Sequence, residues 1–156
     1  MGAGKTTWST KLAEEKNAVL ISEDEWLATL FPDQIHSFDD YKRYAAQLRP
    51  LIQTHVMNLL ATGADVVLDF PANTVKQRRW FGEVSAAAGA DCNLVYLQAS
   101  NETCLRQLGI RRQEQPHRAG FDNEAVFNEV TAYFQEPDVD EGFSMQVINK
   151  DAISSQ

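Results

Sequence analysis

Short, continuous hydrophobic runs alternate along the chain with longer segments in which apolar residues recur every three or four positions. Four runs have the length of a buried strand, and they cover residues 18–22, 66–71, 93–97 and 143–148. Strands that are apolar on both faces are typical of a parallel sheet covered by helices on both sides. The pattern therefore predicts an α/β fold.

Between these runs, helical spacing predicts six helices, at residues 5–16, 24–30, 39–62, 74–88, 101–112 and from 122 to about 134. Thr74, Ser100 and Asp122 stand where an N-cap is expected, because their side chains can accept a bond from the first free amides. Pro50 is expected to kink or divide the long third helix, since it has no N–H to donate. Residues 152–156 are expected to form a frayed tail.

Length and composition describe an ordinary globular protein. The 156 residues, 44% of them hydrophobic, predict one domain over residues 1–156. The formal net charge of −8 argues against a general nucleic-acid binder, which usually has a basic face. Cys92 and Cys104 lack metal-ligand spacing and are expected to be thiols. With no apolar run near 18 residues and no signal-like start, no membrane segment is expected and the predicted location is the cytoplasm.

The first residues carry the clearest chemistry. Gly2-Ala3-Gly4-Lys5-Thr6-Thr7 matches the end of the phosphate-binding motif G-x-x-x-x-G-K-[ST], directly before a predicted helix. Glycines let backbone amides turn toward phosphate oxygens, and the helix N-terminus adds positive charge. Lys5 would bridge the β- and γ-phosphates, and the Thr6 hydroxyl would ligate Mg²⁺. A plain glycine-rich stretch before an ordinary helix is the competing interpretation.

The motif is incomplete in this sequence. Its first glycine would fall two residues before Met1, and a phosphate-binding loop normally follows a buried strand. We therefore expect a fifth strand before Gly2, most of which this chain lacks. A truncated, inactive form is one possibility, because losing a central strand would expose two sheet edges.

Charged residues gather where strands or helices end. Asp69 ends the second predicted strand, where parallel sheets bind ligands, and could hold Mg²⁺ or simply cap a turn. Asp24, beside Glu23, follows the first strand, and it or Ser22 could cap the next helix. A late basic cluster stands out in an acidic chain, although cations also favour helix C-termini; it comprises Arg106, Arg111, Arg112, His117 and Arg118.

These features, in this order, resemble the P-loop kinases related to nucleoside-monophosphate kinases. The closest resemblance is to the "AAA domain" set of small-molecule kinases, which are similar to zeta toxins, gluconate kinases and chloramphenicol phosphotransferase. The resemblance covers nearly the whole chain. It implies a three-layer α/β/α P-loop NTPase fold with sheet order 2-3-1-4-5, in which the absent first strand is the central one.

The resemblance also assigns roles. Gly2, Ala3, Gly4, Lys5, Thr6, Thr7 and Arg111 would bind ATP, and Thr6 with Asp69 would hold Mg²⁺. Asp24 would orient or deprotonate the acceptor hydroxyl. A lid at about residues 111–121 would carry Arg112 and Arg118, which act with Lys5 on the transferring phosphoryl group. Asn73, Arg78 and Arg79 resemble the acceptor side, and Asn149 or Lys150 is a weaker candidate for adenine contact.

The predicted function is transfer of the ATP γ-phosphate to a hydroxyl of a small molecule. Two alternatives stay open. A polynucleotide 5′-hydroxyl kinase is disfavoured by the acidic charge, and a nucleotide-dependent switch or ATPase without kinase activity would share the same loop. The acceptor and any protein partner are not predicted by these residues.

Overall fold

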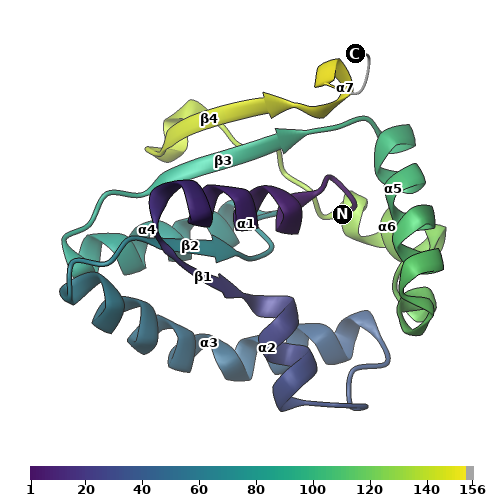
Figure 1. Cartoon of the computed structure of the whole chain (residues 1–156), viewed down its shortest axis with the longest axis horizontal. Helices are drawn as coiled ribbons and strands as arrows, with labels where there is room; N and C mark the ends of the chain where they lie inside the picture. Colours follow the sequence, from purple (N-terminus) through teal and green to yellow (C-terminus); the bar gives the residue numbers. More distant parts are fainter. Residues whose placement is uncertain (154–156) are drawn as a thin grey trace.

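The computed structural model describes residues 1–153, apart from the side chains of His117 and Ile153. Its described strands form two parallel pairs. β1 (Val19–Ser22) pairs with β2 (Val66–Asp69) in the register Ser22 to Asp69, and β3 (Asn93–Gln98) pairs with β4 (Ser144–Asn149). All four strands run in the same general direction (Figure 1). The predicted strands are confirmed within two residues at each end.

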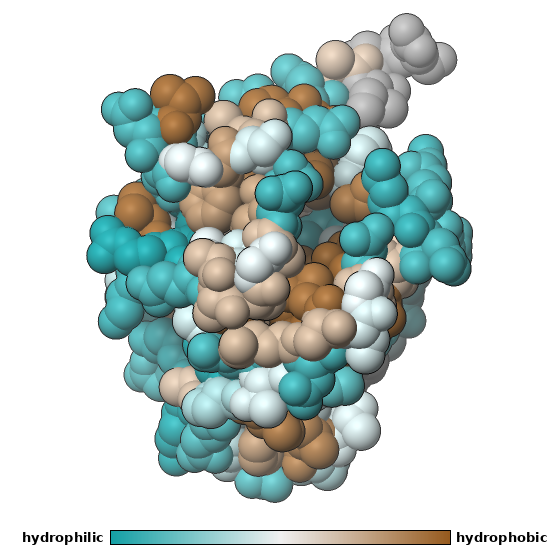
Figure 2. Space-filling view, turned by 90° about the vertical axis from the view of Figure 1, so that its left-hand side faces the viewer, coloured by the Kyte–Doolittle hydropathy of each residue, from teal (hydrophilic) through white to brown (hydrophobic). Residues whose placement is uncertain are grey.

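The two pairs are not joined into one sheet. β2 and β3 have no hydrogen-bonded strand between them among the described residues, and this is the position that the order 2-3-1-4-5 gives to the central strand. A cavity of ≈2390 Å³ extends into this gap, with Val67 and Leu68 on one side and Leu94 and Val95 on the other. Viewed toward the amino ends of the strands, the surface is hollowed near its centre and hydrophobic residues lie in the hollow (Figure 2).

Helices cover the strands and close the ends of the molecule. The α-helices are α1 (Lys5–Lys16), α2 (Glu23–Leu30), α3 (Phe38–Ala61), α4 (Val75–Ala88), α5 (Asn101–Glu114), α6 (Glu124–Ala132) and α7 (Lys150–Ile153). Two short 3₁₀ helices, η1 (Pro116–Gly120) and η2 (Val139–Glu141), lie before α6 and before β4. α1 lies in front of the strands and α4 behind them, while α5 and α6 stand near the carboxyl ends of the strands (Figure 1). Among the described residues, no helix combines the length and hydropathy needed to span a bilayer.

The core is divided in the same way as the strands. The larger cluster belongs to β1, β2, α2, α3 and α4, and its buried residues are Ile21, Leu27, Ala45, Leu48, Ile52, Val56, Phe70 and Val84. A smaller cluster forms around Cys104, Leu108 and Phe127 on α5 and α6, and Met1 and Ala3 pack against it. The N-terminal loop therefore contacts the α5–α6 side before α1 packs on β1 and β2.

Two of the three predicted N-cap residues cap their helices in the structure. Thr74 forms a capping box with Gln77, and the Ser100 side chain accepts a bond from the Thr103 amide. The prediction that Asp122 caps the last long helix is wrong, because Asn123 is the N-cap of α6. Pro50 lies inside α3 and does not divide it. Residues 154–156 of the predicted tail lie outside the described part, and residues 150–153 form α7.

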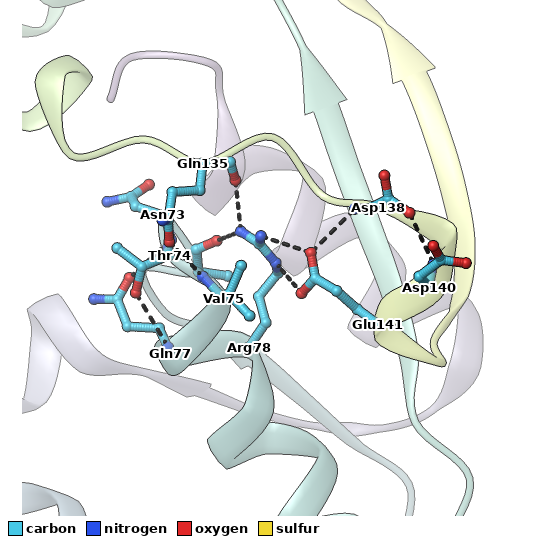
Figure 3. A network of polar contacts seen from close by, with 10 residues as sticks. Asn73, Thr74, Val75, Gln77, Arg78, Gln135, Asp138, Asp140 and Glu141 are labelled. Atoms are coloured by element: carbon cyan, nitrogen blue, oxygen red, sulfur yellow. Dashed lines mark hydrogen bonds and ion pairs between the residues drawn. The ribbon is translucent and has the colours of Figure 1, made fainter.

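A buried arginine connects the β1–β2 half to the segment that leads into β4. Arg78 of α4 is 0% exposed, and its guanidinium donates to both carboxylate oxygens of Glu141 at 2.7 Å (Figure 3). It also donates to the carbonyls of Ala72 and Gln135, at 2.8 and 2.9 Å. These partners hold Arg78 in the interior, and it is not among the residues that line the cavity, so the structure gives its expected acceptor-side role no support. Arg79, in contrast, is exposed.

Candidate nucleotide-binding and acceptor site

The glycine-rich loop leads directly into α1, and two of its glycines have an unusual backbone conformation. Gly2 and Gly4 have φ values of 76° and 82°, a left-handed conformation that favours glycine. A Cβ at Gly2 would lie 2.6 Å from the Cys104 carbonyl oxygen, so this position also requires close approach of two backbones. Gly4 is the N-cap of α1 and contributes no side-chain cap. The first amides of α1 and its positive end therefore remain available to an anion.

Behind the loop, Lys5 and Asp69 form an ion pair. The Lys5 ammonium contacts Oδ1 of Asp69, and the Ser9 hydroxyl lies 3.5 Å from the same oxygen. Asp69 is 1% exposed, and its Oδ2 has no hydrogen-bond partner among the described residues. A buried carboxylate oxygen without a partner is costly unless a cation or water binds it. The hydroxyl of exposed Thr6, one residue after Lys5, and the carboxylate of Asp69 are oxygen donors of the kind that Mg²⁺ prefers.

Two adjacent carboxylates from the first turn of α2, Glu23 and Asp24, also line the cavity. The Tyr41 hydroxyl, from α3, lies 2.8 Å from Oε1 of Glu23 and 3.0 Å from Oδ1 of Asp24. Arg49, also on α3, is 3.7 Å from the other oxygen of Glu23. Because one hydroxyl has one proton to donate, Tyr41 can serve only one of the two carboxylates at a time.

Burial separates these two acids. Glu23 is 1% exposed, whereas the side chain of Asp24 is 42% exposed. Burial raises the pKa of Glu23, and the Tyr41 hydrogen bond and the nearby Arg49 oppose this only in part. Burial, followed by the charges of Asp24 and Glu23, raises the pKa of Tyr41 well above its usual value, so Tyr41 stays a neutral donor. Asp24 is therefore the carboxylate of the pair that is accessible from the cavity.

Two arginines of the basic cluster share one buried carboxylate. Arg111 donates to Asp122 through both Nε, at 2.6 Å, and a terminal nitrogen. Arg118 donates through Nε to Oδ2 of Asp122 at 3.2 Å, and its terminal NH2 group lies 3.9 Å from Oδ2 of Asp24. Asp122 is 1% exposed. This arrangement holds two guanidinium groups at the wall of the cavity.

Most of the predicted site residues lie around one cavity, and two arginines of the basic cluster do not. Gly2, Ala3, Gly4, Lys5, Thr6, Thr7, Asp24, Arg111 and Arg118 all line the one cavity, and buried Asp69 contacts Lys5 beneath it. Arg112 and Arg106 are exposed on α5 and are not among the lining residues. Near the loop, Lys150 lies over the Trp8 ring, 5.9 Å from its centre, and the Asn149 side chain accepts bonds from the first amides of α7.

Three residues of this site carry no functional signal in the sequence. Tyr41 lies within the predicted helix 39–62 without a motif that marks it, and Glu23 stands out only as the neighbour of Asp24. Asp122 stands where an N-cap is expected. The one hint in the sequence is the spacing of Arg118 and Asp122, which are four positions apart and could form a local ion pair. The ion pair of Asp122 with Arg111 could not be predicted, because it depends on the turn made by η1.

Comparison with known proteins agrees with this geometry. The sequence profile described as "AAA domain" matches residues 1–137. The chain belongs to the AAA domain family. This is the P-loop, kinase-like family that the N-terminal motif and the alternating elements indicated.

A solved structure supports the fold of this AAA domain. The "putative kinase" from Chloroflexus aurantiacus J-10-fl superposes with a TM-score of 0.71 at 17% sequence identity, covering 99% of this chain and 82% of that one. No curated protein matches the chain. At this identity the likeness establishes a shared α/β P-loop fold, and the chemistry of this AAA domain must be argued from its own residues.

Proposed function

We propose that this AAA domain is a magnesium- and ATP-dependent kinase that phosphorylates a hydroxyl group of a small molecule. The observation that carries the proposal is the placement of Lys5 and Asp24 in the wall of one cavity, with the guanidinium groups of Arg111 and Arg118 beside them. Catalysis of phosphoryl transfer depends mainly on positioning the two substrates and neutralising the negative charge of the phosphates, and these groups can do both.

Each residue has a specific task in this proposal. The amides at the start of α1 and the Lys5 ammonium bind the phosphates, and Thr6 and Asp69 hold Mg²⁺. Magnesium, when bound, supplies positive charge against the phosphate oxygens. Asp24 accepts the proton of the acceptor hydroxyl, because it is the accessible carboxylate of its pair. Arg111 and Arg118, in the proposed lid at about residues 111–121, stabilise the negative charge of the transition state.

Nucleotide binding is the first step to test, by thermal melting of the chain with and without MgATP. A ligand at 100 times its Kd stabilises the folded state by about 2.7 kcal/mol, which raises the Tm of a domain of this size by roughly 5–10 °C. We expect this shift in the parent and in Lys11→Ala, whose lysine is exposed on the same helix. It should be much smaller in Lys5→Ala. An equal shift in both variants would show that the loop is not the binding site.

The chemical step is tested by ADP release during an acceptor screen with hydroxyl compounds. We expect one class of acceptor to stimulate ADP release, and Asp24→Asn to remove this stimulation while MgATP still raises the Tm. MgATP binding without any stimulated turnover would instead favour the nucleotide-dependent switch. Stimulation by an oligonucleotide 5′-hydroxyl that weakens with salt would favour the polynucleotide kinase.

A further inference from the structure

Arg118 lies between two carboxylates that come from different elements, Asp122 from the residue before the N-cap of α6 and Asp24 from the first turn of α2. Its Nε donates to Asp122 at 3.2 Å, and its terminal NH2 group is 3.9 Å from Asp24. Asp122 also receives two bonds from Arg111, so both its oxygens are engaged. Of the group formed by Arg111, Arg118 and Asp122, the terminal nitrogens of Arg118 are therefore the atoms that approach Asp24 on α2.

The two contacts of Arg118 differ in strength. Asp122 is fully buried and close, whereas Asp24 is 42% exposed and lies near the outer limit of an ion pair. Partly solvated pairs of this length contribute little to stability, because water competes for both charges. The guanidinium can therefore leave Asp24 at small cost while its Nε stays on Asp122.

Each oxygen of Asp24 has a donor nearby before any ligand arrives. The Tyr41 hydroxyl, whose one proton Asp24 shares with Glu23, lies 3.0 Å from Oδ1, and Arg118 lies 3.9 Å from Oδ2. A general base must accept a hydrogen bond from the hydroxyl that it deprotonates. With a cation against Oδ2, an acceptor hydroxyl has to compete with Arg118 for this carboxylate.

Resting on the proposed function, we propose that Arg118 couples nucleotide binding to the release of Asp24. Before nucleotide binds, Arg118 neutralises Asp24; when a polyphosphate enters, its terminal nitrogens move to the phosphate oxygens and Asp24 becomes free for the acceptor. A guanidinium binds phosphate oxygens in pairs, which is a stronger contact than a partly solvated ion pair at 3.9 Å. Nucleotide then binds before the acceptor.

The coupling is measurable without knowing the acceptor, through a double-mutant cycle on nucleotide affinity. The probe is the magnesium complex of a non-hydrolysable ATP analogue, titrated by calorimetry into the parent, Asp24→Asn, Arg118→Met and the double variant. We expect Asp24→Asn to tighten binding about fivefold, because Arg118 no longer has to leave a partner. In the Arg118→Met background the same change should have little effect.

Two controls separate coupling from general charge effects. Glu25→Gln removes an exposed carboxylate from the same turn of α2 and should change the affinity by less than about twofold. Arg118→Lys keeps the positive charge but lacks the planar guanidinium that can bind two phosphate oxygens at once. If thermal melting shows that Arg118→Met does not fold, Arg118→Lys takes its place in the double-mutant cycle.

The outcomes are distinct. Equal tightening by Asp24→Asn with and without Arg118 would overturn the coupling while leaving nucleotide binding intact. Absence of nucleotide binding in the folded parent would overturn the proposed function and the coupling together. Tightening that depends on Arg118 supports the coupling.

Discussion

At the scale of single residues, Asp122 shows how a buried carboxylate organises groups that are distant in sequence. It lies immediately before the N-cap Asn123, so its position suggested a capping role. Its side chain instead turns inward and receives bonds from Arg111 and Arg118. An aspartate at this position belongs to the site, while its neighbour stabilises the helix.

Asp122→Asn is predicted to lower stability by about 2 kcal/mol, because it leaves the Arg111 guanidinium without its charged partner. It should also weaken MgATP binding, since both arginines lose their orientation. Asn123→Ala serves as the comparison and should cost about 1 kcal/mol as the loss of a cap, with MgATP affinity retained. Denaturant unfolding and calorimetry measure the two effects, and the reverse order of destabilisation would show that the buried carboxylate of Asp122 contributes less to the fold than a single helix cap.

Glu23 supplies a pH-dependent prediction. Burial raises its pKa in the folded state, so folding binds a proton at this group. Protonated Glu23 therefore contributes fully to the free energy of unfolding when the pH is below the pKa of this group in the unfolded chain. That contribution is lost as the pH rises through the higher pKa of Glu23 in the folded protein. Glu23→Gln keeps the shape and an acceptor for Tyr41, and should raise the Tm at about pH 8 but not at about pH 4. Exposed Glu25→Gln should leave both Tm values nearly unchanged, and a Tm gain for Glu23→Gln at both pH values would contradict this origin.

At the scale of elements, the segment between α6 and β4, which contains the short helix η2, is held by contacts with α4. Arg78 anchors Glu141 and the Gln135 carbonyl, and the Gln135 side chain accepts a bond from the Val75 amide at 3.0 Å. Arg78 also lowers the pKa of Glu141, because the hydrogen bonds favour the charged carboxylate. These contacts connect the segment leading into β4 to the half that contains β1, β2 and α4.

Glu141→Gln is predicted to destabilise the protein by about 3 kcal/mol, because a fully buried guanidinium would lose its counter-charge. Glu83→Gln changes the same charge at an exposed position of α4 and should be nearly neutral. Urea unfolding of the two variants makes the comparison. Similar midpoints would mean that Glu141 contributes little beyond its surface charge.

The elements themselves could largely be predicted from sequence, because each strand is a short apolar run and most helices have a polar cap. The caps at Thr74 and Ser100 follow from local chemistry alone. The phosphate-binding loop follows from residue type and spacing in the same way. The burial of Arg78 and the Asp24–Tyr41 contact could not be predicted, because they depend on which distant segments pack together.

At the scale of the whole molecule, the two strand pairs and the cores divide the protein into halves that each carry part of the proposed site. Asp24 and Asp69 belong to the β1–β2 half, and Arg111 and Arg118 follow β3. The gap between β2 and β3 separates the two strand pairs, and the cavity reaches into it. Closing this gap should therefore stabilise the fold and fix the site at the same time.

An engineered extension tests this prediction. About five β-branched residues, joined to Met1 by a short glycine-containing turn, are enough for a strand that pairs with both β2 and β3. We expect a higher Tm, a steeper melt and slower amide exchange in β2 and β3 than in the parent. An extension of the same length made of Gly and Ser is the control. Equal melting of the two extended proteins would show that the gap does not accept a strand.

The open position between β2 and β3 also bears on how the protein behaves in concentrated solution. Strand edges with unpaired backbone groups are templates on which strands of other molecules can add. At neutral pH the net charge of −8 keeps molecules apart. Near the isoelectric point of ≈4.8 that repulsion vanishes, so we expect any pairing of molecules through the edges of β2 and β3 to be strongest in mildly acidic solution and weakest in neutral, dilute buffer.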